Sequence, residues 1–295
     1  MMTHQTQIKF IDLIQGSDEW KEFRKMKIGS SIAASILGVG FKTPLQLFES
    51  MIEDTEIPDN EAMRRGREME PKARTWLNEK YGADLKAEVV QHPDSNFDWH
   101  ISSLDGIWQR PDGSYFVCEL KHPGKIDHQK ALDGEVPEKY IPQCLHILED
   151  LPGVNEILYL SYHEDSQAEI WVKRDEKKME KQFSLEQSFY ERLISFKPPE
   201  PTDKDWIEFN RQELISKANT YSFIKDQIDE LQKQAEELKK EIIEDTNWAA
   251  RAKIGDYKIQ KVIRKGNPQY GNIPELKNVN LDAYRGDPII SWRFS

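Results

Sequence analysis

The order of the expected helices and strands predicts an α/β fold, in which a mixed central sheet is flanked by helices and followed by a C-terminal extension. Helical patterns fill most of the first hundred residues, and strand patterns then alternate with two further helical patterns. Three prolines occur within the segment 198–201, where they cannot continue a helix and favour an extended linker. We therefore expect a core over residues 1–200 and a second module over residues 201–295.

The composition is that of a folded protein, with 38% hydrophobic and 32% charged residues in a chain of 295. That length suffices for one large domain or two small ones. The formal net charge of −11 argues against a protein that coats nucleic acid indiscriminately, but it leaves room for a local basic channel. The sequence has neither a run of about eighteen apolar residues nor a signal-peptide pattern. We expect no membrane segment and a cytoplasmic location.

Four helices are expected in the first part of the chain, at Gly16–Lys25, Ser30–Leu37, Thr43–Glu53 and Asn60–Tyr81. A strand near Lys86–His92 follows them. After the hairpin described below, we expect a helix at Pro137–Leu151, strands at Asn155–His163 and Ala168–Arg174, and a helix at Asp175–Phe196.

The second module begins with apolar residues at alternating spacings of four and three, which predict a long amphipathic helix. These residues are Ile224, Ile228, Leu231, Ala235, Leu238 and Ile242. Three heptads are marginal for an independent coiled coil, so the stripe packs either within its own chain or against a partner. The segments Tyr257–Val262 and Ile289–Phe294 are expected to form the β-rich tail.

A β-hairpin is expected at Ile101–Gln109 and Tyr115–Lys121, since the intervening Arg110–Ser114 is rich in turn-forming residues. A hairpin centred on Asp112 places Asp105 opposite Glu119. Directly opposed residues have Cβ atoms about 4.5–5.5 Å apart, so this pair can share one cation. Strand alternation adds Ser103 to the face of Asp105 and Lys121 to the face of Glu119.

Charged residues on otherwise apolar strands need compensation, because unpaired charges are rarely buried. A metal supplies it: carboxylates such as Asp105 and Glu119 suit Mg²⁺ or Mn²⁺, which bind oxygen and keep several waters. Lys121 would orient or deprotonate one of those waters. The alternative is a surface hairpin that carries only a Glu119–Lys121 salt bridge.

Other polar and aromatic candidates receive no functional role. The histidines at 100, 122, 128 and 146 lack a paired metal-ligand spacing, so no zinc site is expected from them. Cys118 and Cys144 form neither a disulfide framework nor a zinc motif, and we expect them to be buried in a reducing compartment. Trp99, Trp108 and Tyr115 lie on expected strands and are assigned to the core.

Five sequence elements in order resemble the YqaJ-type viral recombinase and phage lambda exonuclease family, within the PD-(D/E)XK nuclease superfamily. The resemblance covers roughly residues 20–197. The matching elements are Trp20 with Arg24, Ile28-Gly29-Ser30-Ser31, Gly66-Arg67-Glu68-Met69-Glu70 with Ala73-Arg74, Ser103-Leu104-Asp105-Gly106, and Glu119-Leu120-Lys121-His122-Pro123. Leu104 replaces the usual Pro and His122 the usual Cys, while Gln143-Cys144-Leu145 stands where the family often has Gln-Val-Gln.

The resemblance implies a restriction-endonuclease-like core and a Mg²⁺-dependent exonuclease acting 5′-to-3′ on double-stranded DNA ends, with Mn²⁺ able to substitute. It implies metal ligands at Asp105, Glu119 and the Leu120 carbonyl, with Glu70 reaching the metal directly or through water. Lys121 would position the attacking water, and Gln143 would assist. Three residues would bind the 5′-phosphate: Arg24, Ser31 and Ser103.

The same resemblance implies a ring-shaped trimer and a single-strand-annealing recombination protein as partner. A structure- or sequence-specific endonuclease on the same core remains the alternative, since the metal site alone does not choose between an end and an internal bond. A DNA-binding module that has lost catalysis is the other alternative.

Overall fold

The computed structural model describes residues 7–53, 60–266, 273–276 and 279. The chain divides into two compact units, Met1–Trp206 and Ile207–Ser295, and each is considered by itself. That the module after residue 200 is a separate domain, with a core that folds without it, stays a prediction.

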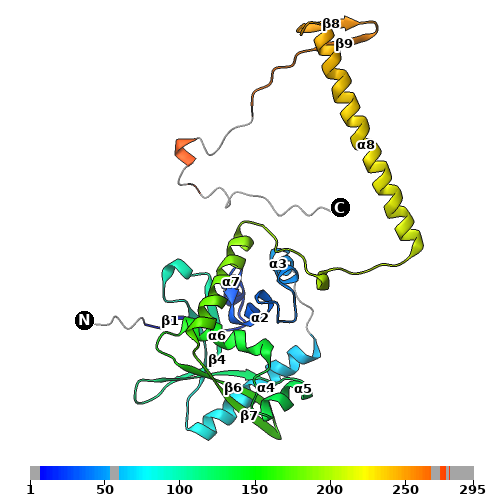
Figure 1. Ribbon diagram of the computed structural model, residues 1–295. Helices are drawn as coiled ribbons and strands as arrows, with labels where there is room; N and C mark the ends of the chain where they lie inside the picture. The colour runs from blue at the N-terminus through cyan, green and yellow to red at the C-terminus, as the bar shows by residue number, and fades with distance from the viewer. Residues whose placement is uncertain (1–6, 54–59, 267–272, 277–278, 280–295) are drawn as a thin grey trace. The chain divides into compact units, whose positions relative to one another are not determined.

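The first unit is built around a seven-stranded sheet with the order β1-β3-β4-β5-β6-β7, and β2 pairs with the beginning of β4 (Figure 1). Two pairings, β2 with β4 and β5 with β6, are parallel, and the others are antiparallel. The expected mixed sheet is therefore confirmed. The strands are β1 (Lys9–Ile11), β2 (Ile28–Gly29), β3 (Lys86–Gln91), β4 (His100–Gln109), β5 (Tyr115–Lys121), β6 (Glu156–His163) and β7 (Ser166–Lys173).

One face of the sheet is covered by α4 (Glu61–Tyr81), as the sequence predicts for residues 60–81. The Asn60 side chain accepts from the backbone N–H of Met63 at the start of this helix, and Gly82 ends it in the left-handed conformation. The buried apolar residues on this side are Ala73, Leu77, Leu85, Phe116, Cys118, Leu120, Leu158, Leu160 and Tyr162.

A larger core fills the other side, between the sheet and α6 (Ile141–Asp150) and α7 (Glu176–Ile194) (Figure 1). The helix expected over 137–151 is divided into a 3₁₀ turn, Glu138–Tyr140, and α6. Pro142 lies in the first turn of α6, where its missing N–H costs no helical hydrogen bond. A further helix, α5 (Lys125–Leu132), was not expected.

The N-terminal helices are α1 (Asp18–Arg24), α2 (Ala33–Ile36) and α3 (Pro44–Ile52). The single helix predicted over 30–37 is wrong in detail, because a 3₁₀ turn at Ser30–Ile32 precedes a single turn of α-helix. Thr43 and Gln46 form a capping box at the start of α3.

The hairpin has the expected register: Gly106 pairs with Cys118 and Gln109 with Tyr115. The ladder stops at Gly106, and Asp105 is not among the residues paired with β5. On its other side, β4 carries an extra residue between Leu104 and Ile107, which oppose Glu88 and Lys86. Such a bulge interrupts the ladder and re-aims a side chain.

The second unit contains α8 (Gln212–Asp245) and a hairpin of β8 (Arg251–Ile254) and β9 (Tyr257–Gln260). The predicted long helix is confirmed, and none of its residues is buried. The predicted strand at Ile289–Phe294 lies outside the described residues. Short 3₁₀ turns occur at Ser95–Phe97, Asp203–Asp205 and Pro274–Leu276. No helix among the described residues has the length and apolar character needed to cross a membrane.

Candidate active site

Three carboxylates and one lysine come together where the hairpin meets α4. Glu70 lies on α4, Asp105 on β4, and Glu119 and Lys121 on β5. The Lys121 ammonium donates to Glu119 Oε1. Glu119 has no solvent exposure, so the alternative of a surface hairpin with an exposed salt bridge is wrong.

Arg74 joins the helix to the hairpin. Its guanidinium pairs with Glu70 on the same helix, and its Nε donates to the backbone carbonyl of Asp105 at 2.6 Å. The Asp105 side chain reaches β5 through Oδ2, which accepts from the backbone N–H of Leu120 at 2.8 Å. The bulge of β4 therefore directs Asp105 toward the Glu119-Leu120-Lys121 segment, although the two strands are no longer paired there.

Carboxylates outnumber basic side chains within this group, in which Glu70, Asp105 and Glu119 face Lys121 and Arg74. Burial, followed by the charge of Asp105, raises the pKa of Glu119 to about 8, even though Lys121 opposes the shift. Burial and Asp105 also raise the pKa of Glu70. Glu119 Oε2 is buried and makes no hydrogen bond within the described residues. A hard divalent cation fits this set, because it would give the orphaned oxygen a partner and offset the repulsion.

The residue that follows Asp105 is Gly106, and close neighbours leave no room for a side chain there. A Cβ built at this position would lie 2.6 Å from Cys118 Sγ and 3.3 Å from the Leu85 side chain. Any larger residue would therefore force β4 and β5 apart beside the carboxylates. Cys118 and Cys144 are both buried and free, as expected.

The three residues expected to bind a 5′-phosphate lie in one region, where Trp20 links them. Arg24 donates to Ser31 Oγ at 3.4 Å, and its guanidinium carbon lies 4.2 Å from the centroid of the Trp20 ring. The indole N–H of Trp20 donates to Ser103 Oγ at 3.0 Å. We call Trp20, Arg24, Ser31 and Ser103 the arginine pocket.

Gln143 stands apart from the other predicted site residues. It lies half-buried on α6, and its side chain makes no hydrogen bond in the part of the chain that the structure describes. Its neighbour Cys144 is near enough to the carboxylates for Glu119 to raise its thiol pKa, after the larger effect of burial. The predicted assistance by Gln143 therefore stays a prediction.

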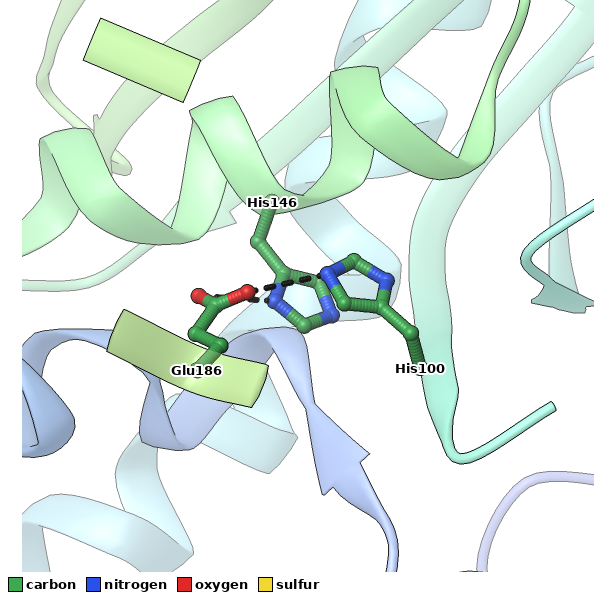
Figure 2. A group of neighbouring side chains, drawn as sticks. All are labelled: His100, His146 and Glu186. Carbon is green, nitrogen blue, oxygen red and sulfur yellow. Dashed lines mark hydrogen bonds and ion pairs between the residues drawn. The ribbon is translucent and has the colours of Figure 1, made fainter. Parts of the chain in front are cut away.

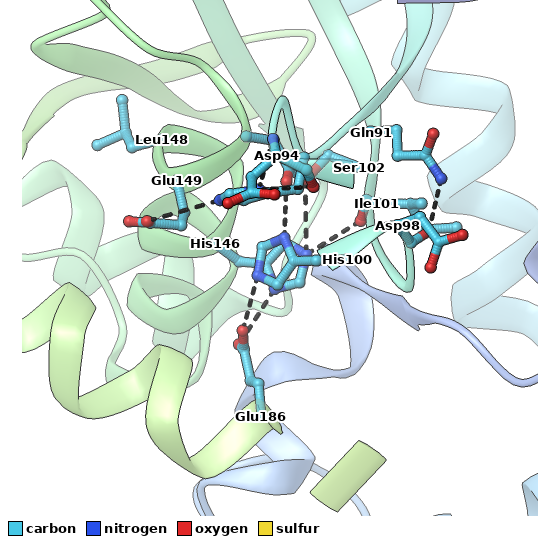
Figure 3. Close-up of polar contacts among 12 residues, drawn as sticks. Gln91, Asp94, Asp98, His100, Ile101, Ser102, His146, Leu148, Glu149 and Glu186 are labelled. Atoms are coloured by element: carbon cyan, nitrogen blue, oxygen red, sulfur yellow. Dashed lines mark hydrogen bonds and ion pairs between the residues drawn. The ribbon is translucent and has the colours of Figure 1, made fainter. Parts of the chain in front are cut away.

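A second buried group of charged residues was missed by the sequence analysis. It joins His100 of β4, His146 and Asp150 of α6, and Glu186 of α7, which we call the histidine clamp. Figures 2 and 3 show His100, His146 and Glu186 next to one another. All four side chains are at most 1% exposed. His100 Nδ1 lies 2.6 Å from Asp150 Oδ1, and its Nε2 lies 2.9 Å from Glu186 Oε2.

His146 completes the clamp beneath the ring of His100. The two imidazoles are stacked, with centroids 3.6 Å apart and planes inclined by 9°. His146 Nε2 lies 3.0 Å from the Ile101 carbonyl, while its Nδ1 lies 3.1 Å from Glu186 Oε1 at an angle that makes no hydrogen bond. Sequence spacing could not reveal this group, because its members come from three separate elements. The only signal was polar residues on the apolar faces of α6 and α7.

The sheet and its flanking helices form a fold that is similar to that of solved exonuclease structures. Two crystal structures of LHK-Exo, an alkaline exonuclease from Laribacter hongkongensis, superpose with TM-scores of 0.53 and 0.52. Both are 21% identical, and the match covers 61% of this chain and 94% of the exonuclease; one contains dAMP.

Residues 19–149 match the family model of the YqaJ-like viral recombinase domain. The protein YqaJ of Bacillus subtilis (strain 168) is 26% identical over 264 residues, which is 81% of each chain. The family resemblance predicted from the five sequence elements is therefore confirmed.

Proposed function

We propose that this protein is a Mg²⁺-dependent exonuclease that degrades double-stranded DNA from its 5′ ends in phage-type homologous recombination, with Mn²⁺ able to substitute. The observation that carries the proposal is the buried Oε2 of Glu119, which has no hydrogen-bond partner among the described residues and lies beside two further carboxylates and Lys121. The matched family and the exonuclease fold support the choice of DNA as substrate. We also propose a cytoplasmic location, in keeping with the two free thiols.

Asp105, Glu119 and the Leu120 carbonyl would hold the metal, and Glu70 would reach it directly or through water. A bound divalent ion would polarise the scissile phosphate and lower the pKa of a water ligand. The protein positions these ligands through Arg74, which holds Glu70 and the Asp105 backbone in one place.

Lys121 would orient the attacking water. Its ammonium is half-buried and held by Glu119, so its donors are aimed at the carboxylate group rather than at bulk solvent. Burial lowers the pKa of Lys121, but the charges of Glu119 and Asp105 raise it overall. In this protonated state Lys121 is a donor that steadies a water or a phosphate oxygen, not a base. Gln143 would assist this step from α6.

The arginine pocket would select the DNA end. A guanidinium presents a planar fork of donors that matches two phosphate oxygens. The stacking of Arg24 on Trp20 fixes the orientation of that fork, and Ser31 and Ser103 add hydroxyls. Because Ser103 precedes Asp105 by two residues, a 5′-phosphate bound in the pocket would lie near the metal ligands.

The test compares linear and covalently closed circular duplexes, each with Mg²⁺, with Mn²⁺ and with chelator. We expect rapid loss of the linear duplex with either metal, no cleavage of the circle and no activity in chelator. Products sampled from 5′-labelled and 3′-labelled duplexes report the direction of degradation.

Other outcomes would select the alternatives. Efficient cutting of the circle would favour the endonuclease. Binding without cleavage under every metal condition would favour a DNA-binding module that has lost catalysis, and full activity in chelator would rule out the metal site.

We further propose that the protein forms a homotrimer and works with a single-strand-annealing recombination protein, as the family resemblance implies. The exposed apolar stripe of α8, which includes Ile224, Leu231 and Leu238, is a candidate contact in either assembly. Sedimentation of the full chain and of residues 1–206 tests this. Monomers of both at micromolar concentration would exclude the trimer and the coiled-coil contact.

A further inference from the structure

The histidine clamp lies on β4 at the place where this strand pairs with β2, and the arginine pocket is built around the same pair of strands. Ile28 and Gly29 of β2 pair with His100 and Ile101 of β4. The clamp holds this part of β4 at successive residues: His100 bonds both carboxylates, the Ile101 carbonyl bonds His146, and Ser102 Oγ donates to Asp150 Oδ2 at 2.7 Å (Figure 3).

The pocket begins where the clamp ends. Ser103, the next residue of β4, accepts from the Trp20 indole. On β2, Gly29 lies against the guanidinium of Arg24, since a Cβ there would be 3.4 Å from Arg24 Nη2, and Ser31 follows two residues later. The clamp therefore holds the stretch of β4 that pairs with β2 and leads directly into Ser103.

The charges of the clamp require His100 to be an imidazolium. Its two ring nitrogens both face carboxylate oxygens, and an ionised carboxylate only accepts hydrogen bonds. Gln182 Nε2 also donates to Glu186 Oε1 at 2.9 Å. Outside the clamp, His92 faces the His100 ring with centroids 5.8 Å apart, and Glu149 lies 4.0 Å from His92 Nε2 and 3.8 Å from Arg174 Nη2.

His100, His146 and Glu186 also place three potential metal-ligand atoms within 4.8 Å of one another. The ring stacking argues against one shared ion. An imidazole binds metal in its own plane at about 2.0–2.1 Å, and two parallel rings 3.6 Å apart cannot both direct a lone pair at one point. The hydrogen bonds from both ring nitrogens of His100 to Asp150 and Glu186 explain the arrangement without a metal.

We propose that His100, held by Asp150 and Glu186, is a positioning residue for the arginine pocket, so that the clamp sets the enzyme's preference for a 5′-phosphorylated end. This inference rests on the proposed exonuclease function. The clamp fixes residues 100–102 of β4 against α6 and α7, and β2 pairs with this stretch. It therefore sets the position of Ser103 relative to Arg24 and Ser31, which flank β2.

The test is His100→Gln, assayed on matched linear duplexes that bear a 5′-phosphate or a 5′-hydroxyl. We expect KM for the phosphorylated end to rise about tenfold, kcat to change less than about threefold, and the values for the hydroxyl end to stay nearly constant. The preference for phosphate should therefore collapse. A general loss of folded enzyme would instead lower both rates together.

His128→Gln is the matched control. His128 is also buried, and its ring nitrogens lie 2.7 Å and 3.0 Å from the hydroxyls of Ser161 and Ser166, but it lies on α5 and both of these partners belong to β6 and β7 rather than to β2 or β4. This variant should keep the phosphate preference of the unaltered protein.

Glu186→Gln provides a second test if His100→Gln does not fold, because it keeps the size and one acceptor of the side chain. The ring ¹⁵N shifts of the unaltered protein at pH 8 should show His100 as an imidazolium. An undiminished phosphate preference in both variants, a neutral His100 at that pH, or zinc binding that disappears in His146→Gln would overturn the inference. Equal rates on both ends in the unaltered protein would overturn the end recognition on which it rests.

Discussion

Two buried charged groups hold β4 in place, and they differ in how their charges are balanced. In the histidine clamp, two carboxylates face two imidazoles, and His100 bonds both of them. In the active-site group, three carboxylates share Lys121 and Arg74, and Glu119 Oε2 is left without a hydrogen bond among the described residues.

The difference lies in the carboxylates: all four carboxylate oxygens of Asp150 and Glu186 accept hydrogen bonds, whereas one oxygen of Glu119 accepts none among the described residues. A buried charge without a partner is costly and persists only where something outside the chain supplies the missing interaction. In the clamp, His146 Nδ1 lacks a hydrogen bond among the described residues, but no carboxylate oxygen does, and this favours a structural role. The comparison therefore predicts that a bound metal stabilises the protein through the active-site group and not through the histidine clamp.

Asp105→Ala and Glu119→Ala should have the largest effect, a loss of cleavage of about a thousandfold or more, because each removes a ligand of the ion that activates the water. Degradation of a linear duplex with Mg²⁺ measures it. Thermal unfolding with and without Mn²⁺ is the control: the unaltered protein should gain stability with the metal, and the variants should not. Cleavage at the normal rate in either variant would show that the active-site group does not bind the catalytic metal.

Glu186→Ala should reduce the free energy of unfolding by about 3–5 kcal/mol, since it leaves a buried imidazolium with an unpaired nitrogen. Urea unfolding without metal measures this. Glu70→Ala, in the active-site group, should cost clearly less, because it removes a charge that other carboxylates already oppose. An equal loss of unfolding free energy in Glu186→Ala and Glu70→Ala would show that the carboxylates of the two groups contribute equally to stability, against the comparison.

Arg24→Ala should reduce the rate of degradation from 5′-phosphorylated ends about tenfold to hundredfold. It removes charge-assisted hydrogen bonds worth roughly 1.5–3 kcal/mol, which correspond to that loss. The metal site should survive. Rates on duplexes with a 5′-phosphate or a 5′-hydroxyl report the preference, and Mn²⁺-dependent stabilisation of the variant confirms an intact carboxylate group. A variant that keeps its preference for the phosphate would remove Arg24 from end recognition.

The clamp should also make stability depend on pH. Burial lowers the pKa of His100, but Asp150 and Glu186 raise it overall to about 10, whereas the unfolded value is about 6.5. Its contribution is complete below about pH 6.5 and is lost as the pH rises toward 10. We expect the free energy of unfolding to fall by about 2 kcal/mol between pH 7 and pH 9.

Glu186 acts in the opposite direction. Burial raises its pKa, but the two imidazoles lower it well below the usual value, so its contribution is lost in acid. Urea unfolding across pH 7–9 should show the decline in the unaltered protein and a flatter profile in His100→Gln. A decline of the same size in that variant would assign it to other groups.

The carboxylate group was predictable because its members are close in sequence or follow a known order. The turn at Arg110–Ser114 sets the register that brings Glu119 toward Asp105, and strand alternation adds Lys121. The bulge was not predictable, because it depends on how β3 packs against β4. For the same reason, the sequence did not show that Asp105 would bond the Leu120 backbone.

The clamp lies beyond what spacing can predict, because its histidines are 46 residues apart and meet only through the packing of α6 on β4. Short elements were missed for a related reason. β2 has two residues and exists only because it pairs with β4, and α5 carries few apolar residues that would mark it as a helix.

Thr43 also connects two distant parts of the chain. Its backbone and hydroxyl begin α3, and the same hydroxyl donates to Asp205, which in turn bonds Thr202. The proline-rich segment is therefore followed by residues that still belong to the first unit. An expression fragment that stops at residue 200 would lose the hydrogen bond between Thr43 and Asp205, whereas one that extends to Trp206 would retain it.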